Sequence, residues 1–374
     1  MSPPPLRVVV AGAGIAGLEA LVALRTLAGH AVDLHLVAPD EDFSLRALSV
    51  FEPFGLARPQ RYAIAEIADD LAAVRHHDAI RGVRLDDREA DLRSGAVLPY
   101  DALLLAVGAS AYPAFEYGAC FDRAHERDAF DEVLDDVRLR MARRVAIVVP
   151  AGATWSLPAY ELAFLLAADA PGTAVTIVTP EREPLEAFGA AAGAMLRDEL
   201  GRAGVDLVCD ARAEVPGHTV VGLGGLRRLS VDRVIHLPSL AGPRPRGVPC
   251  DASGFIEVTD DFRIRGHEDA YAVGDGVAGP VKQGGLAAQQ AGAVAARLAA
   301  RAGSGRAPER FEPVLRALVR TGNGTRYLRS AGGDCVVSSQ CLWWPPSKVA
   351  SRWLMPWLAT RDVQGVSAPA GGRG

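Results

Sequence analysis

The chain has 374 residues and a formal net charge of −5, a length that suits two or three domains with full cores. Its charged residues form no basic stripe, which argues against a nucleic-acid partner. No apolar run reaches the ~18 residues that a membrane span needs, and the first residues (MSPPP) lack the features of a signal peptide, so we expect a cytoplasmic protein. The cysteines show neither a CxxC pair nor metal-ligand spacing, so no metal site is predicted: they are Cys120, Cys209, Cys250, Cys335 and Cys341.

A strand, a glycine-rich turn and a helix open the chain. Residues 6–11 (LRVVVA) are a continuous apolar run, and residues 18–27 carry apolar side chains at helical spacing. The turn between them consists of Gly12, Ala13, Gly14, Ile15, Ala16 and Gly17. Gly12 permits the tight turn, Gly14 lets the backbone approach a pyrophosphate, and Gly17 allows the helix to pack closely on the strand. Because the helix N-terminus presents free N–H groups and a positive dipole end, the sequence predicts a bound dinucleotide.

The second strand of such a fold normally ends in an acidic residue that binds ribose hydroxyls. Here the strand is predicted at residues 32–37 (VDLHLV), and Ala38 occupies the acidic position. Asp40 or Glu41 can substitute for the missing acid. The alternative is that both acids are solvated residues of a turn.

Two later strands also end in glycines. Residues 100–109 (YDALLLAVGA) form a short apolar strand that reaches Gly108, and residues 269–278 (DAYAVGDGVA) form another, with Gly274 and Asp275 at its end. Glycines beside an acid let the main chain come close to a ligand while the carboxylate accepts hydrogen bonds from ligand hydroxyls.

A glycine-rich segment then leads into a helix predicted at residues 286–299. The preceding residues, Gly284 and Gly285, leave the helix N-terminus uncovered near Leu286. A second helix dipole can therefore face an electron-rich ring.

A second strand–helix–strand unit is predicted at residues 144–150, 158–168 and 174–179. Its turn, residues 151–157 (AGATWSL), keeps only Gly152 of the phosphate-binding glycines. Trp155 stands where a backbone should meet a pyrophosphate, and Thr179 holds the acidic position. The sequence therefore predicts the nucleotide-binding fold here, with weakened nucleotide binding.

These motifs, in this order, resemble the two-dinucleotide-binding flavoproteins of the pyridine nucleotide-disulfide oxidoreductase-like superfamily. The resemblance covers residues 6–300 and is strongest to the branch that contains sulfide:quinone reductases and type II NADH dehydrogenases. It implies FAD as cofactor and NAD(P)H as a ligand of the second unit. By this resemblance, the loop containing Gly12, Gly14 and Gly17 holds the FAD pyrophosphate. Gly274 and Asp275 bind the ribityl chain and phosphate, and the helix from Gly284 through Leu286 lies beside the flavin pyrimidine ring.

The implied fold is α/β, with two Rossmann-like dinucleotide-binding domains, one inserted into the other. We expect an FAD-binding domain at residues 1–110 and 237–300, and a second dinucleotide-binding domain at residues 111–236. Residues 238–243 (PSLAGP) are expected to form the return loop. Residues 301–374 are expected to form a C-terminal interface or cap element that begins with a linker at 301–310. Its tail, from Val363 to Gly374, is predicted to be disordered.

Lys282 and Glu161 are the candidate catalytic residues. Lysine is rare in this chain, where it occurs only at Lys282 and Lys348. An ammonium beside flavin N1 and O2 would stabilise the reduced ring, whereas an ordinary surface lysine is the alternative. Glu161 is a candidate because the family places a helix carboxylate near the nicotinamide or a lysine; an exposed helix acid is the alternative.

The loop at residues 42–55 commonly covers the FAD in this branch, which makes Arg46 and Glu52 candidate contacts; ordinary surface residues are the alternative. A helix is expected to follow at residues 64–74.

Residues 152–161 (GATWSLPAYE) resemble the sulfide:quinone reductase segment around one redox cysteine, but Trp155 takes that cysteine's place. Sulfur transfer needs two thiols that can exchange. Cys120 would then have to meet Cys335 or Cys341, and buried inert cysteines are the alternative.

Four tryptophans lie near the C-terminus: Trp343, Trp344, Trp353 and Trp357. Val349, Trp353, Leu354, Trp357 and Leu358 would share one face of a helix that Pro356 breaks. Together with Lys348 and Arg352, this face suits a peripheral membrane contact. Packing on the protein's own core or on the second subunit of a homodimer are the alternatives.

Three functions follow from these expectations. The first is an FAD-dependent oxidoreductase that passes electrons from NAD(P)H to a quinone, a small carrier protein or a small molecule. The second is a sulfide:quinone reductase-like enzyme with relocated cysteines. The third is a non-catalytic FAD-binding sensor or scaffold, which the altered turn at Gly152 keeps open.

Overall fold

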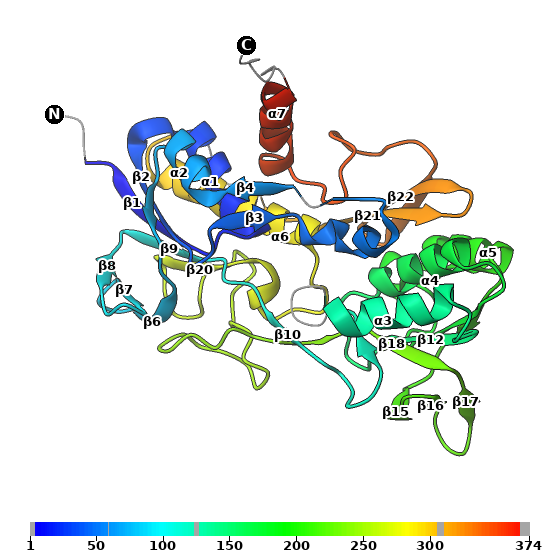
Figure 1. Ribbon diagram of the computed structural model, residues 1–374. Coiled ribbons are helices and arrows are strands. Elements are labelled where there is room, and N and C mark those ends of the chain that lie inside the picture. Colours follow the sequence, from blue (N-terminus) through cyan, green and yellow to red (C-terminus); the bar gives the residue numbers. More distant parts are fainter. Residues whose placement is uncertain (1–3, 59, 123–126, 305–309, 367–374) are drawn as a thin grey trace, which may run out of the picture.

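A computed structural model describes residues 4–58, 60–122, 127–304 and 310–366 (Figure 1). Two five-stranded sheets organise it, each with all of its strands parallel. The first sheet has the order β20-β9-β1-β2-β5 and the second has the order β11-β18-β12-β13-β14. Parallel sheets need cover on both faces, which explains why their central strands are apolar runs rather than alternating patterns.

The first sheet begins with β1, where Val8, Val9 and Val10 are fully buried. Its strands are β1 (Leu6–Ala11), β2 (Val32–Val37), β5 (Val74–His76), β9 (Ala102–Leu105) and β20 (Ala270–Ala272). The two helices of this layer that pack against each other are α1 (Ile15–Ala28) and α6 (Gly284–Arg301). Smaller elements around it are β3 (Asp42–Ser44), β4 (Arg61–Ala63), α2 (Ile64–Asp70), β6 (Ile80–Arg84), β7 (Glu89–Leu92) and β8 (Val97–Pro99), with short 3₁₀ helices η1 (Gly29–Ala31), η2 (Arg46–Phe54) and η4 (Gly274–Gly276).

The second sheet, drawn mainly in green in Figure 1, has its own core around the buried ring of Tyr160. Its strands are β11 (Ala119–Cys120), β12 (Arg144–Val148), β13 (Ala174–Val178), β14 (Val205–Val208) and β18 (Arg233–His236). The associated helices are α3 (Arg127–Arg138), α4 (Leu157–Asp169), η3 (Glu186–Phe188) and α5 (Ala190–Arg202), and a separate meander consists of β15 (Glu214–Gly217), β16 (Val220–Gly222) and β17 (Arg228–Ser230).

The chain crosses between the two sheets twice, and the crossings pair with each other. β10 (Ser110–Tyr112) leaves the first sheet and forms an antiparallel ribbon with β19 (Ser239–Ala241), which returns to it. The sequence predicted a loop at residues 238–243, but the ribbon satisfies backbone hydrogen bonds that a free loop would expose to water. The domain limits expected from the sequence stay a prediction.

The C-terminal region forms a three-stranded antiparallel sheet and a helix. Its elements are β21 (Val314–Thr321), β22 (Gly324–Ala331), β23 (Asp334–Ser338) and α7 (Leu354–Val366). Ala317, Val319 and Leu328 insert into the core of the second sheet, whereas Leu354 and Leu358 insert into the core of the first. No helix among the described residues is long and apolar enough to cross a membrane.

The N-terminus of α7 is bound by a buried carboxylate from α1. Glu19, only 1% exposed, accepts hydrogen bonds from the backbone N–H groups of Arg352, Trp353 and Leu354 at 3.0, 3.0 and 2.6 Å. Burial raises the pKa of Glu19, against the effect of these donors. A negative charge here also complements the helix dipole.

Three sequence predictions about helices and order are wrong. Pro356 does not break the helix, because it lies in the first turn of α7, where its missing N–H would have no intrahelical acceptor. The helix expected at residues 64–74 ends at Asp70, and Val74 begins β5. The expected disorder from Val363 is also wrong up to Val366, which is still helical; residues 367–374 and linker residues 305–309 lie outside the described part.

We predict that Glu19→Ala detaches α7 while leaving the two sheets folded. The substitution removes the acceptor of three N–H groups, so the free energy of unfolding should fall by about 2 kcal/mol. Hydrogen exchange should speed up in α7 and in the segment before it. Glu19→Gln, which keeps one acceptor oxygen, should show a smaller loss, and equal exchange in wild type and Glu19→Ala would contradict the anchoring role.

Candidate active site

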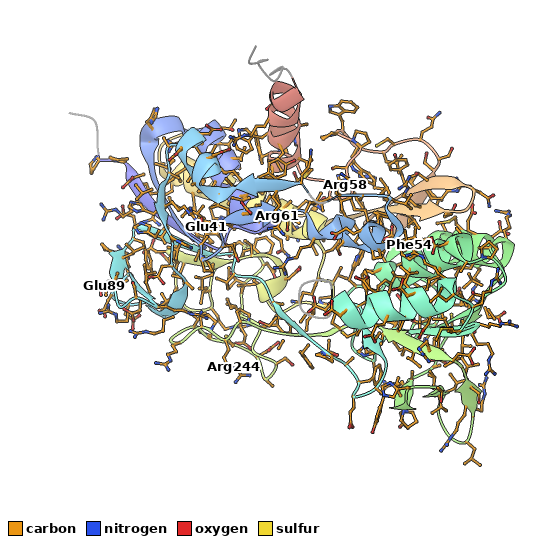
Figure 2. All side chains as sticks on the ribbon, in the orientation of Figure 1. Glu41, Phe54, Arg58, Arg61, Glu89 and Arg244 are labelled. Atoms are coloured by element: carbon orange, nitrogen blue, oxygen red, sulfur yellow. The ribbon has the colours of Figure 1, made fainter. Side chains whose placement is uncertain are left out.

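A long cleft of about 1050 Å³ lies at the carboxyl ends of the first sheet's strands. Ligands of open α/β sheets bind at this edge. The cleft begins at the turn after β1 and runs to the N-terminus of α6, where α4 and β21 also contribute to its wall. Figure 2 places Arg61, from β4, and Arg244, from the loop after β19, at the upper and lower sides of that view; both residues line the cleft.

The three glycines of the first turn are needed for different steric reasons. A Cβ at Gly12, whose φ is +107°, would lie 2.3 Å from the carbonyl oxygen of Ala106, and one at Gly17 would lie 1.8 Å from that of Gly12. A Cβ at Gly14 would meet nothing within 4 Å, because Gly14 faces the open cleft. Gly12 and Gly17 are therefore needed for packing, whereas Gly14 leaves room for a ligand at the N-terminus of α1.

The acids after β2 have separate positions. Asp40 lines the cleft, as the sequence suggested for a substitute ribose contact. Glu41 pairs instead with Arg75 at 2.8 Å and with His77 at 3.4 Å. The side-chain hydrogen bond from Arg75 lowers the pKa of Glu41, so Asp40 is the better candidate to contact a ligand.

Two helix N-termini converge on the far half of the cleft. A Cβ at Gly284 would lie 2.6 Å from Ile15 Cδ1, and one at Gly274 would lie 3.3 Å from Ala16 Cβ and 3.5 Å from Ala287 Cβ. Small residues therefore bring the start of α6 against the start of α1. The positive ends of both helix dipoles face one ligand-sized space.

Asp275 lies in this space with an unusual lack of donors. No residue of the described chain donates a hydrogen bond to its carboxylate, and burial raises its pKa while the charge of Lys282 opposes that shift. Asp275 is partly buried, and a carboxylate in such a position normally has hydrogen-bond partners. Hydroxyl groups of a polyol would supply them, as expected for a ribityl chain.

Lys282 lines the same space and is 5% exposed. Its ammonium donates to the carbonyl oxygen of Val277 and lies 4.1 Å from the ring centroid of Phe255. Burial lowers the pKa of Lys282, whereas the carboxylate of Asp275 raises it. A buried ammonium beside a cleft can stabilise negative charge on a bound ring.

Glu161, on α4, lines the cleft in an ion pair with Lys348. The Lys348 ammonium also donates to the carbonyl oxygen of Leu318 at 2.8 Å. Burial raises the pKa of Glu161 and lowers the pKa of Lys348, while each partner opposes the shift of the other. A membrane interface was one of the alternatives for Lys348, and the structure contradicts it for this residue because its side chain is only 7% exposed.

A second pocket, of about 620 Å³, adjoins the cleft where the two domains meet. Arg46 and Trp155 line both the cleft and the pocket, whereas Glu52 lines the pocket but not the cleft. The loop at residues 42–55 therefore does lie over this region, as β3 and η2.

Most of the predicted site residues are brought together in the cleft: Gly12, Gly14, Ile15, Ala16, Asp40, Arg46, Gly108, Glu161, Asp275, Lys282 and Gly285. Gly17, Gly274 and Leu286 are not among its lining residues; Gly17 and Gly274 instead pack the elements behind it, and the backbone N–H of Leu286 donates to the Gln283 side chain. Sequence reasoning missed further lining residues: Arg61, Arg81, Arg93, Arg244, Gln283, Arg316 and Lys348. The rarity of lysine, which singled out Lys282, could equally have found Lys348.

The cysteines do not support sulfur transfer at this site. No disulfide joins any two of the five cysteines, and none of them lines the cleft or the pocket. Cys120 lies on β11, at one edge of the second sheet, whereas Cys335 lies on β23, which packs on α5 near the opposite edge. Cys120 and Cys335 are therefore not brought together. Cys341, the other candidate partner, is exposed, whereas Cys120 is buried.

Fold and cleft together define a two-domain flavoprotein oxidoreductase. The first turn, Asp275, Lys282 and the two helix N-termini fit the pyrophosphate, ribityl chain and ring of FAD.

Comparisons with known proteins agree. Residues 6–295 match the model of the pyridine nucleotide-disulphide oxidoreductase family. The ferredoxin–NAD(+) reductase component of the biphenyl dioxygenase system of Paraburkholderia xenovorans is 29% identical over 295 residues, 74% of this chain and 69% of that protein.

Among solved structures, sulfide:quinone oxidoreductase from Aquifex aeolicus superposes with a TM-score of 0.77 at 17% identity, covering 89% of this chain and 87% of that one. A ferredoxin reductase from Rhodopseudomonas palustris gives a TM-score of 0.60 at 20% identity, covering 86% and 81%. The chain belongs to the pyridine nucleotide-disulphide oxidoreductase family and is an FAD-dependent oxidoreductase.

We predict that Gly14→Val yields a folded protein without flavin, since the new side chain enters the space that a pyrophosphate needs. Flavin absorbance per mole of purified protein should be nearly lost, while circular dichroism stays that of the wild type. Gly17→Val is the matched contrast: its side chain meets the Gly12 carbonyl, so the protein itself should fail to fold. A yellow, fully loaded Gly14→Val protein would place the cofactor elsewhere.

We predict that Lys282→Met lowers the midpoint potential of the bound flavin by tens of millivolts, because the variant loses a positive charge beside the negative charge of the reduced ring. FAD content should stay near normal, since the pyrophosphate turn is untouched. Lys282→Arg keeps the charge and should retain most of the potential. An unchanged midpoint potential in Lys282→Met would show that the Lys282 ammonium does not lie beside the flavin ring.

Proposed function

We propose that this protein passes electrons from the nicotinamide of NAD(P)H, through FAD, to a small electron carrier or a quinone. One observation carries the proposal: the cleft that fits FAD opens directly into the pocket between the two domains. Arg46 and Trp155 line both spaces, so a donor held in the pocket would lie next to the cofactor. The ferredoxin–NAD(+) reductase relative supports this pairing of donor and acceptor.

When bound, FAD supplies two-electron redox chemistry. The protein's own groups bind and orient it: the N–H groups of α1 hold phosphate, and Asp275 accepts hydrogen bonds from hydroxyls. Lys282 contributes positive charge beside the ring. Glu161 and Lys348 form a buried ion pair in the cleft wall, where burial raises the pKa of the acid and lowers that of the base.

The site for the electron acceptor involves the C-terminal tryptophans. Trp353 and Trp357 pack partly against the core, which favours the own-core alternative for the C-terminal tryptophans. Trp344 is 83% exposed and is the residue we propose for a peripheral contact with a carrier, a membrane surface or a second copy of the chain.

Anaerobic mixing of the oxidised protein with NADH, NADPH or sulfide tests this proposal. We expect either nicotinamide to bleach the flavin within seconds and sulfide to leave it oxidised, because no thiol lies at the site. Rapid bleaching by sulfide alone would replace the proposal with sulfide oxidation, and Cys120→Ala would then show whether that thiol takes part. Bleaching by none of the three would favour a non-catalytic flavoprotein.

A further inference from the structure

The turn of the second domain offers few donors to a diphosphate. In a phosphate-binding turn, the first N–H groups of the following helix hold the anion. In α4 the second residue is Pro158, which has no N–H, and the N–H of Ala159 is already bonded to the carbonyl oxygen of Ser156 at 3.0 Å. The first turn of α4 therefore has fewer free backbone N–H groups to donate to a phosphate than the first turn of α1.

The donor groups around this turn are also already hydrogen-bonded to an acid, Glu181. The Glu181 carboxylate accepts from Ser156 Oγ at 2.9 Å, Tyr160 Oη at 2.6 Å and Thr179 Oγ1 at 3.2 Å, and also from the backbone N–H of Glu186 at 3.1 Å. With four donors it has little capacity left for ribose hydroxyls. Its negative charge, next to the start of α4, opposes a diphosphate.

Trp155 fills the turn itself. Its ring centroid lies 6.0 Å from that of Phe188, which is 1% exposed, so the indole is held by the core of the second domain. A glycine at this place would let a backbone approach a pyrophosphate, as Gly14 does in the first domain. The indole instead forms a wall of the pocket.

The pocket beside this closed turn remains open. Aromatic and apolar side chains form one part of its wall, and charged side chains form another. The first part consists of Tyr112, Phe121, Trp155, Leu237 and Phe255, and the second of Arg46, Glu52, Arg61 and Asp122. Flat aromatic walls suit a planar ring, which they can hold by stacking.

We propose that the second domain binds its redox partner as a single planar ring against Trp155 and, among the described residues, has no seat for the ADP half of a dinucleotide. This inference rests on the proposed function in naming nicotinamide as the ring. The donor would be engaged only through its nicotinamide end, and NADH, NADPH and reduced nicotinamide mononucleotide would be nearly equivalent.

Two measurements on the FAD-loaded protein test the proposal. The second-order rate of anaerobic flavin reduction by reduced nicotinamide mononucleotide should lie within about tenfold of that by NADH. ADP-ribose, added up to millimolar concentration, should neither inhibit that reaction nor release heat in calorimetry with the oxidised protein. A rate for NADH ~100-fold higher, or micromolar binding of ADP-ribose, would overturn the inference.

The calorimetric arm separates this inference from the proposed function. If no nicotinamide reduces the flavin, the donor proposal fails, yet ADP-ribose binding still decides whether the second turn is closed. Binding would contradict closure, and its absence would support it.

Matched variants test the role of Trp155. Trp155→Ala should weaken reduction by both nicotinamides by a similar factor, up to ~10-fold, through the saturation constant rather than the limiting rate. Phe188→Leu changes the packing partner of the indole but not the pocket wall, so it should lower stability and leave the saturation constants for NADH and reduced nicotinamide mononucleotide near those of the wild type. Equal saturation constants in wild type and Trp155→Ala would show that the indole does not contact the donor.

Discussion

Three buried glutamates hold the C-terminal region to the rest of the molecule. Glu19, Glu161 and Glu199 are the buried acids of the described chain. Each meets partners from that region: backbone N–H groups before and within α7, the Lys348 ammonium, and the side chains of Asn323 and Arg326. A charge in a protein interior is costly unless it is paired and hydrogen-bonded, so each acid strongly favours the docked arrangement.

These contacts also complete the cleft. Glu161 belongs to the second domain and Lys348 to the C-terminal region, and their ion pair forms part of the wall beside α6. The Gln283 side chain, at the start of α6, donates to the carbonyl oxygen of Arg316 on β21. The wall is therefore shared by three parts of the chain. Separation of the C-terminal region would open the cleft at the N-terminus of α6.

The sequence predicted the two parallel sheets because buried central strands are continuous apolar runs followed by glycine turns, a local signal. It predicted the cofactor end of the site for the same reason, since Gly12, Gly14 and Asp275 lie at strand ends. It could not place Lys348, which reaches Glu161 only after the C-terminal segment folds back over the second domain. Pro356 was misread because its effect depends on its distance from the helix start, which the Glu19 carboxylate on another helix helps to define.

The two domains share one fold but differ in how their acids are hydrogen-bonded. Asp275 has no donor within the described chain, so ligand hydroxyls can bind it without displacing protein groups. Glu181 has four donors, and a ligand would have to break those bonds to use it. Because an unmet hydrogen bond in a buried site is costly, the first arrangement favours a bound ligand and the second favours the protein alone. The same contrast separates Gly14, whose missing side chain leaves space, from Trp155, whose ring fills it. The fold can therefore be kept in the second domain while the binding of a whole dinucleotide is lost.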